Sequence, residues 1–349
     1  MAVFDDPDFD DHEHVSFGFD ADSGLQAIVA VHNTRLGPGL GGLRMQPYPS
    51  SREALTDVLR LSRGMTYKNA MAGLPHGGGK AVVIGDPARD KREPLLRAMG
   101  RFVERQGGCY ITAEDAGIAV ADLRVLAEET RYLTGLPVAA AADHSGDPSP
   151  ATALGVFGGM AVAVRHRLGA ESLTGCRVAV QGLGSVGDRL AAHLHEAGAR
   201  LVVSDVRKEA VARAQEVFGA EVRPPESIHA ADVDVFAPCA LGGALNDRTL
   251  AEVTAPVVAG AANNQLQRPE HGRRLHERGI LYAPDYVINA GGVIEVAAQW
   301  GVYDGGEVRR RVLGIADTLD QVFREAGATG EPPEVIADRI AERRFRGAS

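Results

Sequence analysis

The segment Arg177-Val-Ala-Val-Gln-Gly-Leu-Gly-Ser-Val-Gly187 decides the fold class of the second half of the chain. It joins a short apolar run to the pattern Gly-X-Gly-X-X-Gly, and a helical run over residues 188–196 follows directly. Glycines at this spacing permit a tight turn and let a pyrophosphate approach the amino end of a helix, whose free amides favour phosphate. The segment therefore predicts a dinucleotide-binding loop between a strand and a helix.

The residues around this loop repeat the same rhythm of short apolar run, Gly-rich turn and helical segment. The expected strands cover residues 177–181, 200–204, 233–236, 256–259 and 279–282. Strands that alternate with helices at this spacing predict a parallel sheet covered on both faces. The alternative is a Gly-rich turn that only packs a helix against a strand, and the full order of elements argues against it.

Asp205 indicates which dinucleotide this loop would hold. It closes the next expected strand, about 20 residues after the glycines, where a carboxylate can accept hydrogen bonds from both ribose hydroxyls and would repel a 2′-phosphate. NAD is therefore the expected cofactor. Arg207 and Lys208 follow at once and could tolerate the phosphate, so some use of NADP stays open.

Size and charge limit the class of partner. At 349 residues the chain is long enough for two domains, and 45% hydrophobic with 24% charged residues is typical of a soluble globular protein. The formal net charge is −9. Nucleic acids and anionic membranes both need a dense cationic surface on their partner, so the charge argues against either one. A small molecule is the expected partner.

Cysteine usage and the amino terminus indicate the compartment. Cys109, Cys176 and Cys239 lie far apart without a Cys-X-X-Cys pair, as in proteins of a reducing compartment. The longest apolar stretch, residues 153–164, falls well short of the roughly 20 residues that cross a bilayer, and the terminus lacks the basic start and apolar run of a signal peptide. We expect a cytoplasmic protein. The terminal run Asp10-Asp11-His12-Glu13-His14 is expected to be solvated and to hold no metal.

The first half of the chain, residues 15–135, begins with a strand-like segment at 26–32, continues into a Gly-rich loop and then enters a helix. Ser50 and Glu53 form a capping pattern at the start of that helix, in which a hydroxyl and a carboxylate can satisfy the first free amides. The helix is expected to run to about Lys68.

Lys68 extends a stripe that is otherwise apolar. Val58, Leu61, Met65 and Lys68 lie on one helix face at spacings of three and four residues. An ammonium group is costly to desolvate there without a partner. Taken alone, Lys68 could equally be a lysine at a frayed helix end that reaches water.

A second lysine makes the functional interpretation stronger. Lys80 follows Gly77-Gly78-Gly79 and precedes an expected strand at 81–84, which places it behind a flexible loop. Two lysines in one cleft repel each other, so the pKa of one should fall towards neutrality, and a neutral amine can act as a base. The segment Tyr110-Ile-Thr-Ala-Glu-Asp115 is expected to be a strand that ends in two carboxylates, of which only one can face the lysines.

These residues belong to a series of segments by which the chain resembles the leucine, phenylalanine and valine dehydrogenases, relatives of glutamate dehydrogenase. The resemblance covers nearly the whole chain. Its segments are Gly37-Pro-Gly-Leu-Gly-Gly-Leu-Arg-Met45, Met65-Thr-Tyr-Lys-Asn-Ala70, Gly77-Gly-Gly-Lys80, Thr112-Ala-Glu-Asp115, Ser149-Pro-Ala-Thr152, Gln181 to Gly187, Ala259-Gly-Ala-Ala-Asn-Asn264 and Asn289-Ala-Gly-Gly-Val293.

The resemblance implies an α/β fold of two domains with the catalytic cleft between them. Residues 1–140 and 325–349 would form an α/β domain for substrate binding and oligomerisation, and residues 141–324 a Rossmann-type NAD-binding domain. The boundary would fall in the Pro- and Gly-containing segment 142–150. A homo-oligomer, either a dimer or an octamer, is expected.

The resemblance also implies the activity, which is reversible NAD-dependent oxidative deamination of an L-amino acid to the 2-oxo acid and ammonia. Lys68 would bind the substrate carboxylate. Lys80 would be the general base or acid that acts through water, and Asp115 would assist proton transfer at the substrate nitrogen.

A further set of residues is implied to bind the cofactor. Thr152 and Asn263 would lie near the nicotinamide, with Asn264 and Asn289 close by. Cys239 is expected to be a small buried residue without a thiolate role, since hydride transfer needs no nucleophile. The full expected set is Thr152, Gly182, Gly184, Ser185, Val186, Gly187, Asp205, Ala237, Pro238, Cys239, Ala261, Asn263 and Asn289.

The substrate pocket is implied to be apolar. Besides Lys68, the expected substrate-binding residues are Leu40, Gly41, Ala113, Asn263, Val293 and Val296. An apolar wall suits leucine, valine or isoleucine, and nothing in it would pair the second carboxylate of glutamate. One methylene group is worth only about 1–3 kcal/mol in discrimination among such substrates.

Three positions depart from the common family pattern, namely Leu43, His76 and Glu295. If His76 or Glu295 faced the cleft, a polar substrate would become plausible. The main alternative is a phenylalanine or other aromatic amino-acid dehydrogenase, because the small Ala113 leaves room. The second alternative is a catalytically silent NAD-binding regulatory protein, which would be expected to lose one of Lys68, Lys80 and Asp115.

Overall fold

The computed structural model describes residues 3–137 and 146–347 and divides the chain into two compact units. The first unit comprises residues 1–147, 296–304 and 341–349, and the second comprises 148–295 and 305–340. The expected domain bounds stay a prediction. Their junction at 140 and 141 lies outside the described residues, and in the structure the chain leaves the second unit at residue 341, whereas 325 was expected.

The first unit is built on a six-stranded mixed sheet in the order β1-β2-β5-β3-β6, with β4 also paired to β5. β2 is antiparallel to both β1 and β5, while β3 and β4 run parallel to β5 and β6 runs parallel to β3. The strands are β1 (His14–Asp20), β2 (Leu25–Asn33), β3 (Gly39–Leu40), β4 (Leu43–Gln46), β5 (Gly77–Ile84) and β6 (Tyr110–Ile111). Since β3 and β4 pair with successive parts of β5, the two residues between them lie beside the middle of β5.

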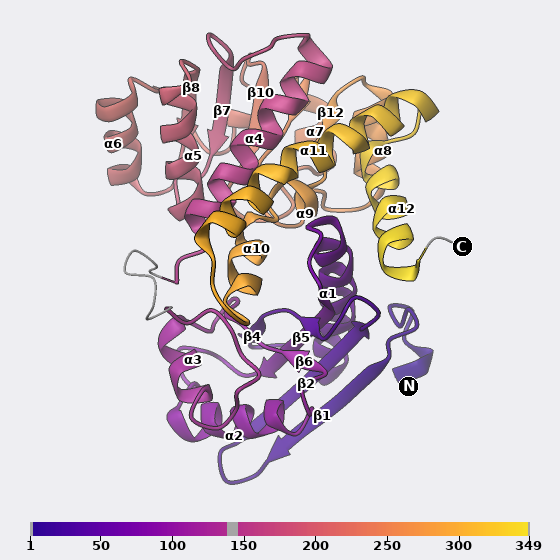
Figure 1. Cartoon of the computed structure of the whole chain (residues 1–349). Coiled ribbons are helices and arrows are strands. Elements are labelled where there is room, and N and C mark those ends of the chain that lie inside the picture. The colour runs from indigo at the N-terminus through magenta and orange to yellow at the C-terminus, as the bar shows by residue number, and fades with distance from the viewer. Residues whose placement is uncertain (1–2, 138–145, 348–349) are drawn as a thin grey trace. The chain divides into compact units, whose positions relative to one another are not determined.

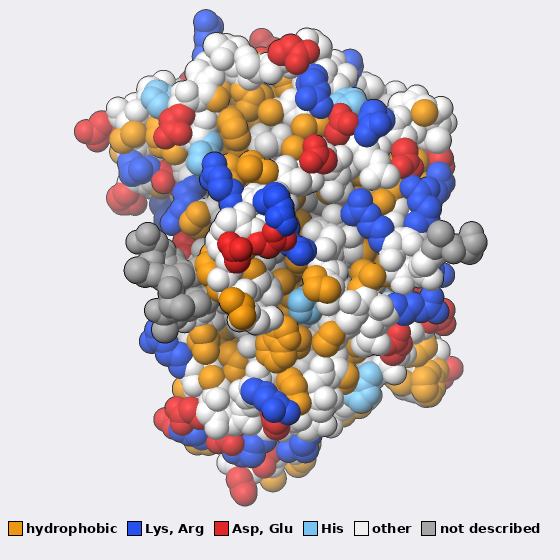
Figure 2. All heavy atoms as spheres, viewed as in Figure 1, with side chains coloured by type: hydrophobic (Ala, Val, Ile, Leu, Met, Phe, Trp, Pro, Cys, Tyr) orange, Lys and Arg blue, Asp and Glu red, His pale blue; other side chains and the backbone are white. Residues whose placement is uncertain are grey.

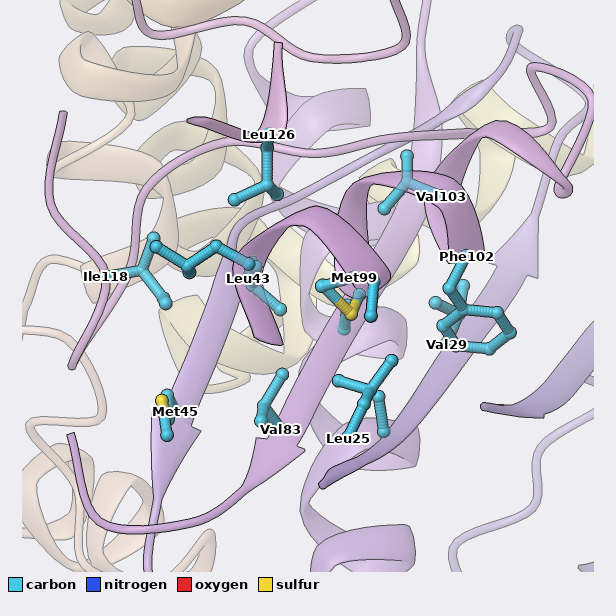
Figure 3. Packing of buried hydrophobic residues seen from close by; sticks show 14 of the residues in the cluster. Leu25, Val29, Leu43, Met45, Val83, Met99, Phe102, Val103, Ile118 and Leu126 are labelled. Atoms are coloured by element: carbon cyan, nitrogen blue, oxygen red, sulfur yellow. The ribbon is translucent and has the colours of Figure 1, made fainter. Parts of the chain in front are cut away.

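Helices pack on both faces of this sheet (Figure 1). α1 (Ser51–Met71) covers one face, and α2 (Glu93–Glu104) with α3 (Val120–Leu126) covers the other. Figure 3 shows the second interface, in which Met99, Phe102, Val103 and Leu126 of the helices pack against Leu25, Val29, Leu43, Met45 and Val83 of the strands. Side chains alternate along a strand, so Ala81 and Val83 face α2 while Lys80 and Val82 face α1.

The predicted start of α1 is confirmed. The hydroxyl of Ser50 accepts a hydrogen bond from the amide of Glu53 at 3.2 Å and caps the first turn. The helix continues to Met71, three residues beyond the expected end. Lys68 therefore lies within the last turn of a continuous helix.

The triple glycine lies inside β5, so the expected flexible loop before Lys80 is wrong. A Cβ atom on Gly77 would overlap the carbonyl of Asn33, and one on Gly78 would overlap the backbone of Thr66 in α1. A Cβ atom on Gly79 would come within 2.7 Å of the Tyr110 ring. These glycines therefore allow β2, α1 and β6 to approach the strand closely, and Lys80 sits within the strand.

The strand expected over 110–115 is shorter than predicted. β6 covers only Tyr110–Ile111, and the next residues continue as isolated bridges, including Leu43 with Glu114 and Asp115 with Ile118. The amide of Leu43 donates to the carbonyl of Ala113 at 2.8 Å, so this segment still runs alongside β4.

The second unit contains a six-stranded parallel sheet in the order β12-β11-β10-β7-β8-β9. Its strands are β7 (Arg177–Gln181), β8 (Arg200–Ser204), β9 (Glu221–Val222), β10 (Val235–Pro238), β11 (Val257–Val258) and β12 (Leu281–Tyr282). Numbered within the unit, this is the order 3-2-1-4-5-6 of the doubly wound dinucleotide-binding fold. The predicted fold class is confirmed, and the limits of β7 and β8 match the expected ones.

Helices follow these strands, and α4 and α11 lie side by side (Figure 1). The helices are α4 (Ser149–Leu168), α5 (Ser185–Glu196), α6 (Lys208–Phe218), α7 (Asp247–Glu252), α8 (Glu270–Glu277), α9 (Asp285–Ile288), α10 (Gly291–Ala298), α11 (Gly305–Thr329) and α12 (Pro333–Arg346). α4 contains the apolar stretch 153–164, which is a buried helix as expected. Within the described residues, no helix is both long and apolar enough to cross a membrane.

The amino-terminal acidic run is not uniformly solvated, which corrects the expectation. His12 is buried at 7% exposure, and its Nε2 lies 3.0 Å from both the Leu59 carbonyl and the Ser62 hydroxyl of α1. Asp10 accepts a hydrogen bond from Arg63 at 2.7 Å. The run is therefore tied to α1 at these two residues. Elsewhere, acidic and basic side chains are interspersed over the face in Figure 2.

Candidate active site

A partly buried ion pair forms the centre of the candidate site. Lys80 Nζ lies 2.9 Å from Asp115 Oδ2, and the lysine side chain is 7% exposed. The two residues come from β5 and from the segment after β6, so the structure brings together the base and the carboxylate that the sequence singled out. Glu114, the adjacent carboxylate, makes no such pair with Lys80 among the described contacts.

Gly42 makes the approach of Asp115 possible. A Cβ atom on Gly42 would overlap the Glu114 carbonyl and come within 2.8 Å of the Asp115 Cβ. On the neighbouring strand, the amide of Ala81 donates to the Gly42 carbonyl at 3.3 Å. A residue without a side chain at this point therefore lets Asp115 reach across to Lys80.

Burial shapes the ionisation of this pair. Desolvation lowers the pKa of Lys80 and outweighs Asp115, which acts to raise it, and the Arg44 guanidinium lowers it further. The pKa of Asp115 is also lowered, because Lys80 and Arg44 together outweigh the burial that acts to raise it. Lys80 can thus lose its proton more readily than an ordinary lysine, while Asp115 stays ionised. Burial is the main cause of the lowered pKa of Lys80, and the cation that acts on it is Arg44 and not the second lysine that the sequence suggested.

Arg44 is a residue that sequence reasoning missed as part of the site. It lies on β4, and its Nε donates to Asp115 Oδ2 at 2.9 Å, the same oxygen that pairs with Lys80. Its second nitrogen donates to Asp57 of α1 at 3.1 Å. The only signal in the sequence was its place in the Gly37–Met45 segment, which gives no hint of its partners.

Lys68 lies on α1, the helix that covers the Lys80 face of the sheet. Its side chain is half-buried, which fits neither a fully exposed lysine nor a buried core residue. Met65, one turn earlier on the same helix face, is close to Gly41, since a Cβ atom there would lie 3.0 Å from Met65 Cγ. The stripe that carries Lys68 therefore runs beside the segment between β3 and β4.

Several expected pocket residues also belong to the first unit. Leu40 and Ala113 are buried at 1% and 5% exposure. Val296 is placed by Thr134, whose hydroxyl donates to the Val296 carbonyl at 2.6 Å, and Thr134 is a second residue that sequence reasoning missed. Val293 is half-buried and belongs to the second unit.

The three departures from the family pattern fall in different places. Leu43 is fully buried in the core beneath α2. Glu295 lies on α10 at 8% exposure. His76 is 5% exposed, and its Nδ1 has no hydrogen-bond partner among the residues that the structure describes. Burial lowers the pKa of its imidazole. A neutral His76 adds no charge to this part of the first unit.

In the second unit, the three glycines of the loop after β7 have the positions that a dinucleotide requires. Gly182 has φ of 98°, in the left-handed region that favours glycine. Gly184 faces open space, with nothing within 4 Å of an added Cβ atom, whereas a Cβ atom on Gly187 would overlap the Gly182 carbonyl. Gly184 also begins α5 without a side-chain cap, so the first amides, from Ser185 onward, are available to a phosphate. These residues fit a bound dinucleotide.

Asp205 follows β8 and lies against the same loop. Its Oδ2 accepts the amide of Leu183 at 2.6 Å, and its Oδ1 accepts both the amide of Arg207, at 2.8 Å, and the guanidinium, at 3.2 Å. Burial acts to raise the pKa of Asp205, but these donors hold it below its usual value. The carboxylate thus stays ionised beside the loop, with Arg207 alongside.

The remaining expected cofactor residues gather near the carboxyl ends of β7, β10 and β11. Ala237 and Pro238 end β10, and the amide of the next residue, Cys239, donates to the Gln181 carbonyl at 2.8 Å. Burial raises the pKa of the Cys239 thiol to about 12, so it is protonated. Val186 lies in the first turn of α5.

A side-chain amide pair lies at the same edge of the sheet. Asn289 Nδ2 donates to Asn263 Oδ1 at 2.8 Å and to the Ala261 carbonyl at 3.1 Å. Asn289 is buried, at 3% exposure, and these two hydrogen bonds fix the 261–263 segment. Thr152, in the first turn of α4, donates to the Pro148 carbonyl at 3.0 Å. No described group of His, Cys, Asp and Glu side chains could hold a metal ion.

Known proteins share these features over almost the full length of the chain. A family model described as the Glu/Leu/Phe/Val dehydrogenase dimerisation domain matches residues 11–132, and one described as Glutamate/Leucine/Phenylalanine/Valine dehydrogenase matches 145–208 and 203–302. The chain is 52% identical to a leucine dehydrogenase of Geobacillus stearothermophilus over 345 residues, which cover 99% of this chain and 94% of the relative.

Two further relatives are similar at nearly the same level. A valine dehydrogenase of Streptomyces virginiae is 49% identical over 340 residues, covering 97% of this chain and 94% of that protein. The crystal structure of an L-tryptophan dehydrogenase from Nostoc punctiforme superimposes with a TM-score of 0.85 at 45% identity, covering 96% of each chain. Both family models and the near full-length identity lead to one conclusion: this chain belongs to the Glu/Leu/Phe/Val dehydrogenase family of amino-acid oxidoreductases.

Proposed function

We propose that this protein catalyses the reversible, NAD-dependent oxidative deamination of branched-chain L-amino acids. The observation that carries the proposal is the partly buried pair of Lys80 and Asp115 on the sheet face covered by α1, the helix that carries Lys68. The names of the relatives support the substrate class, since they include leucine and valine dehydrogenases at about 50% identity. The products are the 2-oxo acid, ammonium, NADH and a proton, with one water consumed.

Lys68, Lys80 and Asp115 have different roles in the proposed reaction. Lys68 binds the substrate carboxylate as a fixed cation. NAD, held by the glycine loop after β7, would supply the hydride acceptor for the substrate Cα, and loss of the hydride would leave an iminium on the substrate. Lys80, as a free amine, takes a proton from the water that attacks this carbon, and Asp115 supports proton transfer at the departing nitrogen. The lowered pKa of Lys80 makes the free amine more accessible than that of an ordinary lysine.

NAD is the cofactor in this proposal. Gly184 leaves room for the pyrophosphate, while Gly182 permits the turn and Gly187 permits close packing of α5 on the loop. The ionised Asp205 favours ribose hydroxyls over a 2′-phosphate. Asn263, held by Asn289, and Thr152 would lie towards the nicotinamide end. The guanidinium of Arg207 beside Asp205 would reduce the repulsion of a 2′-phosphate, so low activity with NADP is compatible with the arrangement.

Leu40, Ala113 and Val296 of the first unit are the apolar residues proposed to line the pocket, and Val293 of the second unit stays an expected member of the set. Gly41 allows close packing against Gly79 and Met65 beside them. A specific observation favours a second candidate, an aromatic amino-acid dehydrogenase, because a tryptophan dehydrogenase is 45% identical to this chain. Formation of NADH should therefore be measured with a panel of aliphatic, aromatic and acidic L-amino acids. We expect the highest kcat/KM with leucine, valine or isoleucine. Activity confined to phenylalanine or tryptophan would replace the aliphatic assignment by the aromatic one.

A variant tests the role of Lys80. Lys80→Ala should lower kcat by about 100-fold or more, because general acid–base catalysis contributes on the order of 10²–10⁴. Lys91→Ala is a matched control, since Lys91 pairs with a different carboxylate, that of Asp122, at 2.7 Å. Undiminished turnover in Lys80→Ala would refute the mechanism. Binding of NAD without turnover of any amino acid in the wild type would instead support the silent regulatory alternative.

A further inference from the structure

Arg44 occupies a place that the proposed chemistry does not yet use. Its guanidinium bridges two carboxylates, with Nε 2.9 Å from Asp115 Oδ2 and a terminal nitrogen 3.1 Å from Asp57 Oδ2. The hydroxyl of Tyr48 donates to the same Asp57 oxygen at 2.6 Å. Asp115, Arg44 and Asp57 therefore form a continuous chain of charged hydrogen bonds that ends on Lys80.

We propose that Arg44, supported by Asp57, is a positioning residue that holds the Asp115 carboxylate and so decides how readily Lys80 gives up its proton. The proposal rests on the proposed function, because it assigns a task to Lys80 as a base. Arg44 acts through Asp115 and Lys80 and touches neither substrate nor cofactor in this scheme.

The shared oxygen is the first argument. Lys80 and Arg44 both lie 2.9 Å from Asp115 Oδ2. Arginine keeps its charge at any pH that proteins experience, whereas lysine can lose its proton when it is buried. With Arg44 in place, loss of the Lys80 proton leaves Asp115 still paired with a cation. Without Arg44, the same step would leave a partly buried carboxylate without a charged partner, which is costly.

The position of Arg44 on the sheet is the second argument. Arg44 lies next to Leu43 on β4, and Lys80 lies next to Ala81 on β5, the register partner of Leu43. Leu43 and Ala81 face α2, so alternation turns both charged residues towards α1, where Asp57 lies. Asp57 is one turn before Leu61 on the helix face that continues to Lys68. Arg44 is thus fixed between α1 and Asp115 from two sides.

The charged groups around Lys80 act in opposite directions. Arg44 on β4 lowers the pKa of Lys80, while Asp115 after β6 and Asp57 on α1 raise it. Tyr48 and Tyr110 face the same carboxylates, and both have a raised pKa, mainly through burial, so their hydroxyls stay neutral. Glu114 lies on the adjoining segment, and burial raises the pKa of its carboxyl. α1 also carries the cation Lys68.

A purely structural role is the competing explanation, in which Arg44 only ties β4 to α1. The two explanations differ in what they predict for the pH dependence of turnover. A structural tie would change the thermal stability and lower activity at all pH values alike. A positioning role shifts the pH range over which Lys80 acts as a base, with a larger effect on kcat than on the KM for the amino acid.

The test measures kcat for oxidative deamination against pH in the holoenzyme saturated with NAD. In Arg44→Gln the ascending limb of the profile should move to higher pH by about one unit or more, the size typical of a charge within hydrogen-bond distance. Arg44→Lys, which keeps a cation, should recover most of the wild-type profile. Asp57→Asn removes a charge that favours protonated Lys80, so its limb should move to lower pH.

Arg63→Gln provides a matched control. Arg63 also lies in the first unit and also bridges a carboxylate, Asp10, at 2.7 Å, but it lies on α1 outside the Lys80 network. The ascending limb of the pH profile of Arg63→Gln should coincide with that of the wild type. A profile in Arg44→Gln with an unmoved limb and uniformly lower kcat would overturn the proposal in favour of the structural role.

A readout without turnover separates this proposal from the proposed function. The pH dependence of the acetylation rate of Lys80 by acetic anhydride, followed by peptide mass spectrometry, reports how readily this amine loses its proton. A shift of this dependence to higher pH in Arg44→Gln supports the positioning role even if no amino acid is turned over. An unchanged dependence refutes it even if the wild type is an active dehydrogenase.

Discussion

At Asp115 a single carboxylate oxygen serves two cations, and this arrangement is poorly explained by stability. Burial of an ion pair has a desolvation cost that often matches its Coulombic gain, so a pair of well-packed apolar residues would stabilise the sheet at least as well. The lysine is held inside a strand, where its position is fixed by the backbone on both sides. Such a pair is better understood as a means of keeping a reactive amine in one place.

Gly42 should be as important for turnover as Lys80 and Asp115, because its missing side chain leaves the space in which these two residues meet. In Gly42→Ala the added Cβ atom would meet the Glu114 carbonyl and the Asp115 Cβ, which forces Asp115 away from Lys80. A displacement of about 1 Å can reduce turnover on the order of 100-fold. We expect kcat to fall by about that factor while far-UV circular dichroism stays unchanged.

Gly64→Ala is the control for this variant. Gly64 lies within α1, and nothing lies within 4 Å of an added Cβ atom. Alanine should raise the helix propensity there and stabilise the protein by roughly 0.5–1 kcal/mol without loss of turnover. Equal kcat in Gly42→Ala and the wild type would show that Asp115 needs no such space.

The residues of the site differ in how far the sequence could reveal them. Lys80 and Asp115 stand in recognisable segments, and their chemistry is evident from residue type. Arg44 stands in such a segment too, but its partner Asp115 is 71 positions away along the chain and Asp57 is on a helix. The alignment of β4 with the segment after β6 and the packing of α1 on the sheet bring them together. Thr134 and its bond to Val296, 162 positions away, were hidden for the same reason.

At the level of elements, the close contact of α4 with α11 depends on glycine. A Cβ atom on Gly159 would come within 2.5 Å of Leu319 and 2.7 Å of Ile288. Gly158, the adjacent residue, has only the Ala316 Cβ at 3.9 Å. Both glycines lie in the middle of the same helix, so an alanine at either position gains the same helix propensity.

The difference between the two alanine variants therefore isolates packing. Gly159→Ala should be less stable than Gly158→Ala by about 1–3 kcal/mol, the usual cost of overpacking a core contact. Denaturant unfolding, followed by intrinsic fluorescence or circular dichroism, measures the difference. Identical midpoints would mean that α11 can move away from α4 at little cost.

The sequence predicted best those elements that are encoded by consecutive residues. β7, the glycine loop and α5 are each encoded by consecutive residues, and β7 and β8 begin and end where expected. The triple glycine was misjudged because a glycine run looks the same in a flexible loop and in a tightly packed strand. Its neighbours, Asn33, Thr66 and Tyr110, come from three distant segments, so the distinction appears only in three dimensions.

On the scale of the whole chain, a buried histidine network joins both ends of the sequence to α1. His32 Nδ1 lies 2.8 Å from the Thr66 hydroxyl, and its Nε2 lies 3.7 Å from Asp10. The rings of His12 and of Phe345 near the carboxyl terminus lie 4.9 and 6.3 Å from the His32 ring. Burial and the neighbouring His12 lower the pKa of His32 from 6.5 to about 4.

This network should make the fold sensitive to acid. Between pH 6.5 and about 4 the unfolded chain binds a proton at His32 that the folded chain does not bind, so stability is lost as the pH falls through this range. Protonation of His32 lowers the free energy of unfolding by about 3 kcal/mol once the pH has fallen through this whole range. Urea unfolding at pH 7.5 and pH 4.5 should show a smaller difference in His32→Asn than in the wild type.

The control for this prediction is His14→Gln. His14 is exposed and contacts the side chain of Gln106 at 2.9 Å, so its replacement should leave the difference between the two pH values unchanged. If His32→Asn also leaves that difference unchanged, His32 is not the group whose protonation weakens the fold. His12, whose pKa burial also lowers, would then be the next residue to vary.

Assembly of the molecule can be argued from the edge of the first sheet. β1 pairs with β2 alone in the described strand order, so its other edge is open. Phe17 and Phe19 project from one face of β1 at 62% and 72% exposure. Open strand edges and exposed aromatic residues are features of surfaces that associate, and the family model over residues 11–132 is described as a dimerisation domain.

We therefore predict that this face of β1 lies in a contact between copies of the chain. The double variant Phe17→Thr and Phe19→Thr keeps residues that favour strands but removes the apolar surface. Its mass by sedimentation velocity should fall below that of the wild type at equal concentration. Phe4→Thr removes an equally exposed aromatic residue, at 75% exposure, from a segment before the sheet and should leave the mass unchanged. Because neither phenylalanine on β1 is buried in the single chain, a smaller assembly with unchanged circular dichroism would place the contact at this edge, whereas an unchanged mass would place it elsewhere.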